Sequence, residues 1–572
     1  MKLLSFLALA LLAAAGATRL STVSAVQPPA INTINALKLA NSISCSPDRQ
    51  VMEKWTEETD IPPMPGAGIY QWKINTPHDS ARFYFNQGIN TYYGFHIIES
   101  LASFKKAATF DSLNPMIWWA QALAYGPNIN DVSYAVLPQA LEAVDKANAL
   151  LAKASPVERG LIKAITARYS KDTTQTREKL NADYKQAMQT LYTRYPAHAD
   201  IAALYVDAMM IEHPWELWNI NGTPKPWTPA IRAVLEKTLI KSPEHPGLNH
   251  YYIHVMEPSP YPEKALASAD RLGRLTPGLA HMVHMPSHIY LRTGYYGKGY
   301  RVNEEAVAQF NGYLQLYPAV AGGEFLYRLH NEHMLINCAM HAGRRQYTID
   351  KSLAFQKTIE AFLSEPGAMG NYLAYIYMVP TLTMIRFEDW KGLLETPAVD
   401  SSKVYATLLS HFGRGMAFAN TGKISEAEAE SGIVQKLVKD PVLSLPFTPF
   451  SPAIDGAVIA DNMLAGTIAL AKKNYTEAIS HFQVAVEREN NMVYNEPRDW
   501  LLNPKYYLAD AYFRAGNWKE AEAMFRNDLK DNNENVWSLN GLHKALQQQG
   551  KNEAAAKVAA RLKVAARDSD VF

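Results

Sequence analysis

Apolar residues recur along this chain with the spacing of an amphipathic α-helix. From about residue 80 onward they occupy positions i, i+3, i+4 and i+7, and Gly, Asn or Pro interrupts the pattern roughly every 12 to 18 residues. No run alternates apolar and polar residues over the length of a β-strand. The pattern therefore predicts an all-α protein built from many short helices.

A repeat with a period of 34 residues is visible toward the C-terminus. The motif that begins at Gly516 returns at Gly550, and related copies begin at Thr421 and Lys473. Each copy combines a short turn with a Glu-Ala pair, which is typical of the helix–turn–helix unit of tetratricopeptide (TPR) repeats. In such a unit glycine ends the first helix and alanine lets the second helix approach closely. Because one unit cannot bury its apolar face alone, the units must stack, and the sequence predicts a TPR-like α-solenoid.

Six segments follow from these patterns. A less regular stretch precedes the first repeats, and because it contains prolines such as Pro28, Pro29, Pro62 and Pro63, we expect an extended or partly helical arm there. Boundaries inside the array are soft, since no low-complexity linker separates the repeats. The predicted segments are a signal peptide (1–25), an irregular N-terminal arm (26–78), N-terminal TPR-like repeats (79–240), His-rich TPR-like repeats (241–345), middle helical repeats (346–455) and C-terminal TPR repeats (456–568).

The N-terminus has the pattern of a secretory signal. Lys2 precedes an apolar run from Leu3 to Ala17, and Val23-Ser24-Ala25 supplies the small residues of a cleavage site. The run is too short to span a bilayer comfortably, and no later stretch approaches about 18 consecutive apolar residues. We therefore expect a mature protein that is secreted or periplasmic, with no transmembrane span after signal cleavage. An uncleaved anchor is the alternative.

Charge and cysteine content exclude several classes of protein. Lys and Arg number 56 against 55 Asp and Glu, a net charge of +1. This balance argues against a nucleic-acid binder, because counterion release needs a basic surface. Two cysteines, Cys45 and Cys338, exclude a disulfide scaffold and a Cys-rich zinc module, and nothing in the sequence requires them to pair. Histidine stands out instead, because nine of the 16 lie between His245 and His341.

The His-rich stretch is itself repetitive. The string that begins at Pro246 matches the one at Pro277 at an offset of 31 residues, and this register aligns Glu257 with His288. On a helix with about 100° per residue, each string places its histidines within an arc of roughly 60°, and a third helix does so within roughly 80°. The three faces are His250, His254 and Glu257; His281, His284 and His288; and His330, His333 and His341, with Asn337 and Cys338 beside the last.

Three His-bearing faces in register favour a transition-metal site. The segments between them, 261–275 and 297–313, have the pattern of second helices, so the His-bearing helices are first helices of consecutive repeats. Such helices line the concave surface of a solenoid about 8–10 Å apart, which lets neighbours share one ion. Imidazoles near a carboxylate suit copper, zinc or iron. The candidate ligands are His250, His254, His281, His284, His288, His330 and His333, and Glu257 is the candidate ligand or general base.

An open coordination position on such an ion makes a site catalytic. The sequence thus predicts a metal-dependent enzyme, oxidative or hydrolytic, that acts on a small molecule or peptide in the concave groove. Three other hypotheses stay open: a non-enzymatic scaffold that binds a peptide or partner protein in the same groove, metal storage without turnover, and histidines that merely hydrogen-bond backbone or tyrosine groups. The sequence contains no P-loop, dinucleotide fingerprint, nucleophile elbow or His-Glu-x-x-His motif.

Other residues carry weaker signals. His245 and His213 each precede a proline; we expect His245 to cap a helix, whereas His213 is a second-tier ligand candidate. For His341 taken alone a structural role is favoured. The segment Glu496–Trp500 lies in an insertion of the array, where a solvated loop is favoured over one that folds back onto the concave face. Turn formation explains Gly126–Asn130.

Five short blocks add one further observation: Phe85–Gly88 with Tyr93–His96, the Trp118–Trp119 helix with Gly126–Asn130, His213–Leu217, His245–His254 and His281–Tyr290. Together they resemble an exported family of TPR proteins over roughly residues 80–560. The resemblance implies the TPR fold and export, and it implies no particular activity. Family members more often read Gly-Phe-Asn-His near His96, whereas here His96 directly follows Phe95, which leaves the role of His96 open.

Overall fold

The computed structural model describes residues 60–130, 138–317, 325–363, 367–445 and 451–572. Within these ranges every regular element is an α-helix or a short 3₁₀-helix, and an isolated β-bridge joins Trp218 and Pro224. The predicted all-α architecture is confirmed. The predicted signal peptide (1–25) and Cys45 lie outside the described residues.

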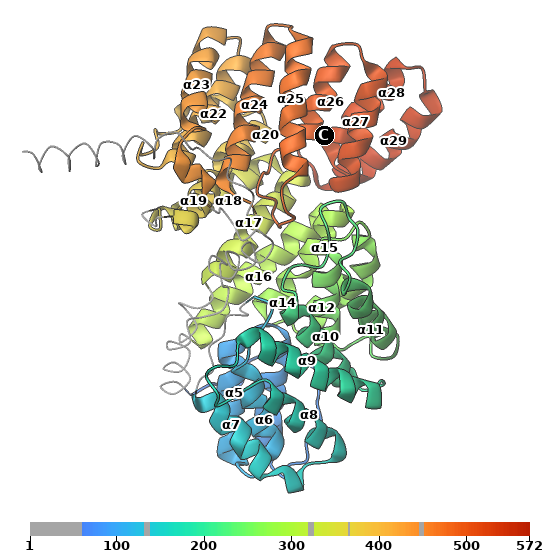
Figure 1. Ribbon diagram of the computed structural model, residues 1–572. Coiled ribbons are helices and arrows are strands. Elements are labelled where there is room, and N and C mark those ends of the chain that lie inside the picture. Colours follow the sequence, from blue (N-terminus) through green and yellow to red (C-terminus); the bar gives the residue numbers. More distant parts are fainter. Residues whose placement is uncertain (1–59, 131–137, 318–324, 364–366, 446–450) are drawn as a thin grey trace, which may run out of the picture. The chain divides into compact units, whose positions relative to one another are not determined.

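The N-terminal repeats are pairs of helices joined by short turns, shown in blue to green in Figure 1. The helices are α4 (Asp79–Tyr93), α5 (Ile97–Phe110), α6 (Pro115–Ala124), α7 (Pro138–Ala149), η1 (Leu151–Lys153), α8 (Pro156–Ala167), α9 (Arg177–Arg194), α10 (Ala199–Glu212) and α11 (Thr228–Lys241). α4 packs along α5 and α9 along α10, and first helices of neighbouring pairs also touch, as α4 does α6. Asn114 caps α6 through the backbone N–H of Met116.

The His-rich repeats continue the array. Their helices are α12 (Pro246–Met256), η2 (Pro262–Ala265), α13 (Leu266–Leu275), α14 (Ala280–His284), α15 (Pro286–Thr293), α16 (Tyr296–Leu316) and α17 (Phe325–His341). The second helices that the sequence predicts at 261–275 and 297–313 correspond to η2 with α13 and to α16. The middle His-bearing helix is divided at Met285 into α14 and α15, because Pro286 has no N–H to continue the backbone ladder.

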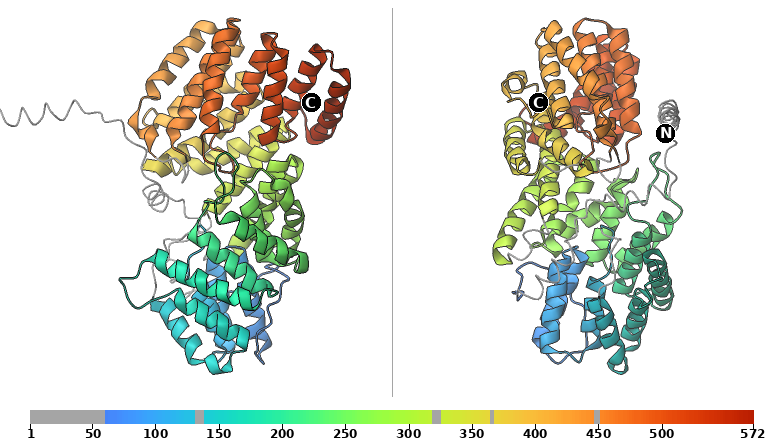
Figure 2. Two further views of the ribbon diagram at one scale, coloured as in Figure 1. Left: turned by 45° about the vertical axis from the view of Figure 1, so that its right-hand side comes forward. Right: turned by 60° about the vertical axis from the view of Figure 1, so that its left-hand side comes forward.

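The C-terminal repeats show the stacking most plainly (Figure 2). Their helices are α18 (Arg345–Glu360), α19 (Gly367–Tyr377), α20 (Val379–Arg386), α21 (Trp390–Glu395), α22 (Val404–Asn420), α23 (Ile424–Leu437), η4 (Pro441–Ser444), α24 (Ala453–Ala471), α25 (Tyr475–Asn490), α26 (Pro504–Arg514), α27 (Trp518–Asp531), α28 (Val536–Gln548), α29 (Asn552–Ala565) and η5 (Ala566–Asp568). The first helices α22, α24, α26 and α28 contact one another in series, and each packs on its own second helix. The chain is therefore the TPR-like α-solenoid that the sequence predicts.

The turns of the C-terminal pairs share one backbone conformation. Gly422, Gly516 and Gly550 have φ values of 78°, 80° and 70° directly after the first helix, where a residue without a Cβ is least strained. Lys473 occupies the same position in its copy and has a φ of 62°. The alanine of the Glu-Ala pair is fully buried in three copies: Ala427, Ala478 and Ala521. These local features match the repeat read from the sequence.

The described part of the N-terminal arm, residues 60–78, contains no helix and packs on the repeats. The backbone N–H of Trp72 donates to the Asn86 side chain on α4 over 2.7 Å. The backbone N–H of Gly278 donates to the carbonyl of Gly66 over 2.8 Å. The arm thereby joins the first helix pair to the His-rich repeats.

Among the described residues, one helix has the length and hydropathy of a membrane span. α24 contains 19 residues, and its most apolar 18-residue window has a mean hydropathy of 1.3. Most of that window, 61%, is buried inside the protein, and the helix contacts α22, α25 and α26. These contacts are those of a core helix in the array.

Candidate metal centre

The His-bearing helices lie against one another in chain order, since α12 contacts α15 and α15 contacts α17. This packing gathers six of the seven candidate ligands into two groups of three. Within each group the facing nitrogen atoms all lie within 4.8 Å of one another. The first triad is His250, His254 and His281, and the second triad is His284, His288 and His330.

In the first triad the Nε2 atoms face one another. His250 Nε2 lies 3.0 Å from His254 Nε2 and 3.1 Å from His281 Nε2. All three side chains are buried. Metal–nitrogen bonds of about 2.0–2.1 Å in a tetrahedral site place ligand nitrogens roughly 3.3 Å apart. The two distances from His250 Nε2 are therefore close to those between the ligands of a bound ion.

Hydrogen bonds assign the proton of each ring in the closest pair. His250 Nδ1 lies 2.6 Å from the backbone carbonyl oxygen of Tyr93, which can only accept, so Nδ1 is the donor. His254 Nδ1 lies 3.2 Å from Glu257 Oε1, and an ionised carboxylate also only accepts. In the neutral rings both Nε2 atoms therefore present lone pairs to each other at 3.0 Å. A cation between them removes this repulsion.

The second triad repeats the arrangement. His288 Nε2 lies 2.9 Å from His284 Nε2 and 3.5 Å from His330 Nε2. His284 Nδ1 donates to Asn303 Oδ1 over 2.6 Å. The orientation of this amide is set by its other end, because Asn303 Nδ2 donates to the carbonyl of Gly299. The Nε2 atom of a neutral His284 therefore carries a lone pair that faces His288.

Two buried carboxylates contact His288 at Nδ1, the ring nitrogen that does not face the triad. Glu257 Oε2 lies 2.9 Å and Glu496 Oε2 lies 2.7 Å from His288 Nδ1. Glu257 uses its second oxygen, Oε1, for His254, so both of its oxygens face imidazole nitrogens. These two glutamates and His288 also form a third metal-capable group. The contacts themselves are those of carboxylates that orient metal-binding histidines.

Burial keeps most of the imidazoles uncharged. Desolvation is the largest cause, and nearby imidazoles add to it, because each disfavours a positive charge on the others. A neutral imidazole at neutral pH is the form that binds a metal ion. The pKa values of His250, His281 and His284 lie well below the usual range, and the pKa of His330 falls to about 3.

His288 differs from the other ligands because of its two carboxylates. Burial disfavours its charge, but Glu257 and Glu496 outweigh burial and raise the pKa of His288 to about 10. Burial likewise opposes ionisation of Glu257, whereas His288 and His254 overcome it and hold the pKa of Glu257 below its usual range. Burial raises the pKa of Glu496 to about 7. Glu257 is therefore ionised at neutral pH and acts as an acceptor only.

Two aromatic residues with a left-handed backbone contact the first triad. Phe95 has a φ of 59°, and its ring centroid lies 4.5 Å from that of His250. Trp215 has a φ of 60°, and its ring meets His254 edge-on at 5.2 Å while remaining 40% exposed. Such backbone conformations are costly outside glycine and concentrate at functional sites. Both residues with a strained backbone therefore contact candidate metal ligands, Phe95 at His250 and Trp215 at His254.

His333 and His245 lie outside both triads. The ring of His333 is 6.1 Å from Phe355 and 6.2 Å from Tyr375, and among the described residues His333 belongs to no metal-capable group. On α17 it is turned about 60° from His330, which is enough to face a different neighbouring helix. His245 accepts from the backbone N–H of Leu248 and caps α12, as its position predicts.

Two further histidines, His341 and His213, pack against aromatic rings outside the triads. His341 Nδ1 lies 3.0 Å from the carbonyl oxygen of Asn337, and its ring packs 5.1 Å from Tyr296. His213 stacks on Trp227 with ring centroids 3.6 Å apart. Neither residue belongs to a metal-capable group among the described residues.

The segment Glu496–Trp500 is not the solvated loop that its position favoured. Glu496, Asp499 and Trp500 are only 6, 5 and 2% exposed. Glu496 lies against His288, 208 positions earlier in the chain. The insertion between two repeats is the signal that could have found this contact, because extra residues in a regular array are free to cover a neighbouring repeat.

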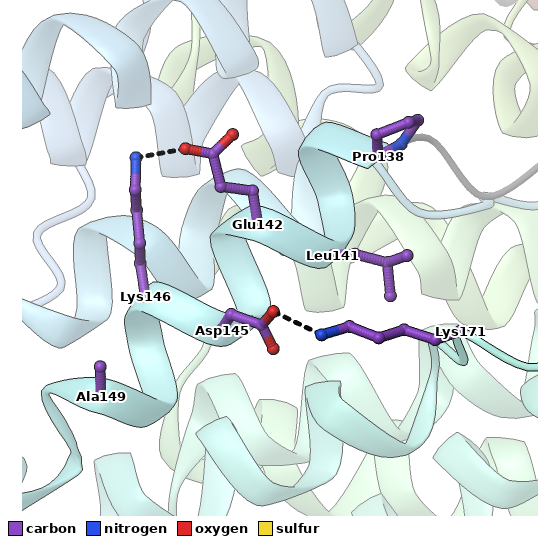
Figure 3. A pocket seen from close by; sticks show the side chains of 7 residues that line it. All are labelled: Pro138, Leu141, Glu142, Asp145, Lys146, Ala149 and Lys171. Carbon is purple, nitrogen blue, oxygen red and sulfur yellow. Dashed lines mark hydrogen bonds and ion pairs between the residues drawn. The ribbon is translucent and has the colours of Figure 1, made fainter.

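A surface pocket elsewhere offers no comparable chemistry. The pocket lies along α7. Two exposed ion pairs, Lys146–Glu142 (2.7 Å) and Lys171–Asp145 (2.8 Å), line it (Figure 3). Its lining residues are Pro138, Leu141, Glu142, Asp145, Lys146, Ala149 and Lys171. Because this lining includes no imidazole or thiol, the triads are the stronger candidate site.

Comparisons with known proteins supply no argument about function. No protein-family model and no curated protein matches the sequence. Solved structures that resemble it include the human IFIT1 dimer with m7Gppp-AAAA (13% identity, 94% of this chain, 96% of that chain, TM-score 0.28), yeast Tom70 (10%, 85%, 91%, 0.28) and the P58(IPK) TPR domain (11%, 83%, 99%, 0.21). At these TM-scores the likeness carries no functional argument. The TPR-like assignment rests on the stacked helix pairs, and membership of the exported family stays a prediction.

Proposed function

We propose that the chain is a transition-metal protein whose first triad binds one ion through three Nε2 atoms. The contact between His250 and His254 carries the proposal, because their Nε2 atoms lie 3.0 Å apart while each Nδ1 atom is held by an acceptor. His281 supplies the third nitrogen. Three protein ligands leave a fourth position for water or substrate, which distinguishes catalytic from structural sites.

The donor set defines the class of ion. Neutral imidazoles suit copper, zinc and iron, and copper binds most tightly in the divalent series. A bound ion of this kind polarises a substrate or activates water or dioxygen. The residues of this chain hold the ligand rings: the Tyr93 carbonyl orients His250, and Glu257 orients His254. A metal-dependent enzyme, oxidative or hydrolytic, is the function that this arrangement supports best.

Burial favours a small substrate over a peptide. No histidine of the first triad is more than 5% exposed, and the partly exposed ring of Trp215 contacts His254. A peptide in a groove needs exposed side chains to contact. The alternative, a scaffold that binds a peptide or partner protein at these residues, requires the triad to open and predicts binding without metal.

Metal analysis of protein purified without an affinity tag tests the proposal. We expect the His250→Ala, His281→Ala double variant to contain one equivalent less of copper, zinc or iron than the wild type, because it lacks two of three ligands. His333→Phe is the matched control and keeps the full metal content. Circular dichroism checks that both variants fold. A wild type without metal, whose melting temperature is unchanged by a chelator, contradicts the proposal.

Export is a separate part of the proposed function. It is supported by the charged residue Lys2, the apolar run from Leu3 to Ala17 and the small residues before Val26. N-terminal sequencing of the protein recovered outside the cytoplasm is expected to begin at Val26. Recovery of the full-length chain in the cytoplasm alone contradicts export.

A further inference from the structure

We infer that the second triad is a second ion site and that Glu257 links it to the first. This inference rests on the proposed function, because it extends ion binding from one triad to both. It assigns one ion to each triad and gives a positioning role to a carboxylate that the sequence suggests as a ligand or general base. A two-ion centre differs from the single shared ion that the sequence predicts.

The two triads are built on the same plan. Each combines two histidines one helical turn apart with a third from the next His-bearing element, so that Nε2 atoms converge from two sides. In the first triad the pair is His250 and His254. In the second it is His284 and His288, and their Nε2 atoms lie 2.9 Å apart. The second site therefore has the same three-imidazole donor set and takes the same class of ion.

Outward contacts at Nδ1 direct the Nε2 atoms of His284 and His288 toward each other. His284 donates through Nδ1 to Asn303, and His288 donates through Nδ1 to Glu496, while Glu257 Oε2 lies 2.9 Å from the same nitrogen. Hydrogen bonds of this kind fix the tautomer and the ring orientation of metal-binding histidines. A proton on His288 Nε2 satisfies the same geometry without a second ion. The number of ions bound per protein distinguishes a second ion from a proton at His288 Nε2.

The triads adjoin each other at two places. His281 and His284 lie on the same short helix with ring centroids 6.0 Å apart, and the rings of His254 and His288 are 6.4 Å apart. Glu257 contacts both His254 and His288. Its Oε1 lies 3.2 Å from His254 Nδ1 and its Oε2 lies 2.9 Å from His288 Nδ1. One buried carboxylate thus orients one ligand in each triad.

Titration of the apoprotein with Zn²⁺, followed by calorimetry and metal analysis, tests the second site. We expect two equivalents in the wild type and one in the His284→Ala, His330→Ala double variant. The His250→Ala, His281→Ala variant also retains one, provided by the second triad. One equivalent in the wild type, unaffected by the loss of His284 and His330, overturns the second site and leaves the first intact. No binding at all overturns the proposed function as well.

The link through Glu257 has its own test. Glu257→Ala removes both acceptors and is expected to weaken both equivalents about 10- to 100-fold. Glu496→Ala is the matched control, because His288 is the one triad histidine that the Glu496 carboxylate contacts, and it should weaken one equivalent. If Glu257→Ala does not fold, the isosteric Glu257→Gln replaces it: an amide accepts at one end only, so at least one equivalent weakens. Unchanged affinity for both ions in a folded Glu257 variant overturns the link.

Discussion

His250 Nε2 lies 3.0 Å from His254 Nε2, and the other nitrogen of each ring is hydrogen-bonded to a group that only accepts. Two imidazoles at this distance ordinarily share a proton that one of them donates. Here the Tyr93 carbonyl and the Glu257 carboxylate each hold the Nδ1 atom of one ring, and the two Nε2 atoms face each other. We propose that an ion lies between these Nε2 atoms, with the nearby His281 as its third ligand.

Loss of the Trp215 ring is expected to speed the removal of the bound ion. Trp215 is 40% exposed and meets His254 edge-on at 5.2 Å. Trp215→Ala should therefore raise the rate at which a chelator extracts the ion by about tenfold, a drop of ~1.4 kcal/mol in the barrier. Stopped-flow mixing with a coloured chelator measures this rate.

Trp518 is the matched control for Trp215, because it is 38% exposed but lies on α27, which carries no residue of either triad. Trp518→Ala should leave the extraction rate unchanged. Equal rates in the two variants contradict a role for the Trp215 ring at the site.

Replacement of His333 is expected to change the pH dependence of stability. Burial lowers the pKa of His333 from 6.5 to about 3. Between these values the unfolded chain binds a proton that the folded protein does not, so stability is lost as the pH falls below 6.5. His333→Phe removes this loss and keeps an aromatic ring beside Phe355.

Urea denaturation at two pH values measures the effect of His333→Phe. The difference in unfolding free energy, variant minus wild type, should be about 2 kcal/mol larger at pH 5 than at pH 7.5, which means that the variant is relatively more stable at pH 5. The same difference between variant and wild type at both pH values is incompatible with a neutral, buried His333.

Two substitutions at the repeat turns, Lys473→Gly and Gly516→Ala, are expected to change the stability of the protein in opposite directions. Lys473 has a φ of 62°, so Lys473→Gly should stabilise the protein by about 1 kcal/mol by relieving left-handed strain. Gly516 has a φ of 80° and no atom within 4 Å of an added Cβ, so Gly516→Ala should destabilise by a similar amount through conformation alone. Chemical denaturation of both variants measures the changes. Effects of the same sign contradict a shared turn.

The repeat architecture was predictable because its signals are local. Gly516 and Gly550 mark turns by their own backbone preference, and the buried Ala521 marks where paired helices approach. The helical spacing of apolar residues likewise reports the packing face of each helix. None of these features depends on knowing which distant residues meet.

The division of the histidines into triads could not be predicted in the same way. His281 and His284 share a face of α14, yet they belong to different triads, because the partners of His281 lie on α12 and those of His284 lie on α15 and α17. Helical arcs group residues on one helix and do not show which neighbouring helix each faces, which is why His333 was grouped with His330. The contact of Glu496 with His288 depends on how a loop folds 208 positions away.

X-ray absorption spectroscopy of the protein loaded with one equivalent of zinc or copper measures the proposed ligands directly. We expect about three imidazole nitrogens per ion at roughly 2.0–2.1 Å, and fewer in a His254→Ala variant that still folds. A spectrum without imidazole scattering, or one that the loss of His254 leaves unchanged, contradicts an ion held by the first triad.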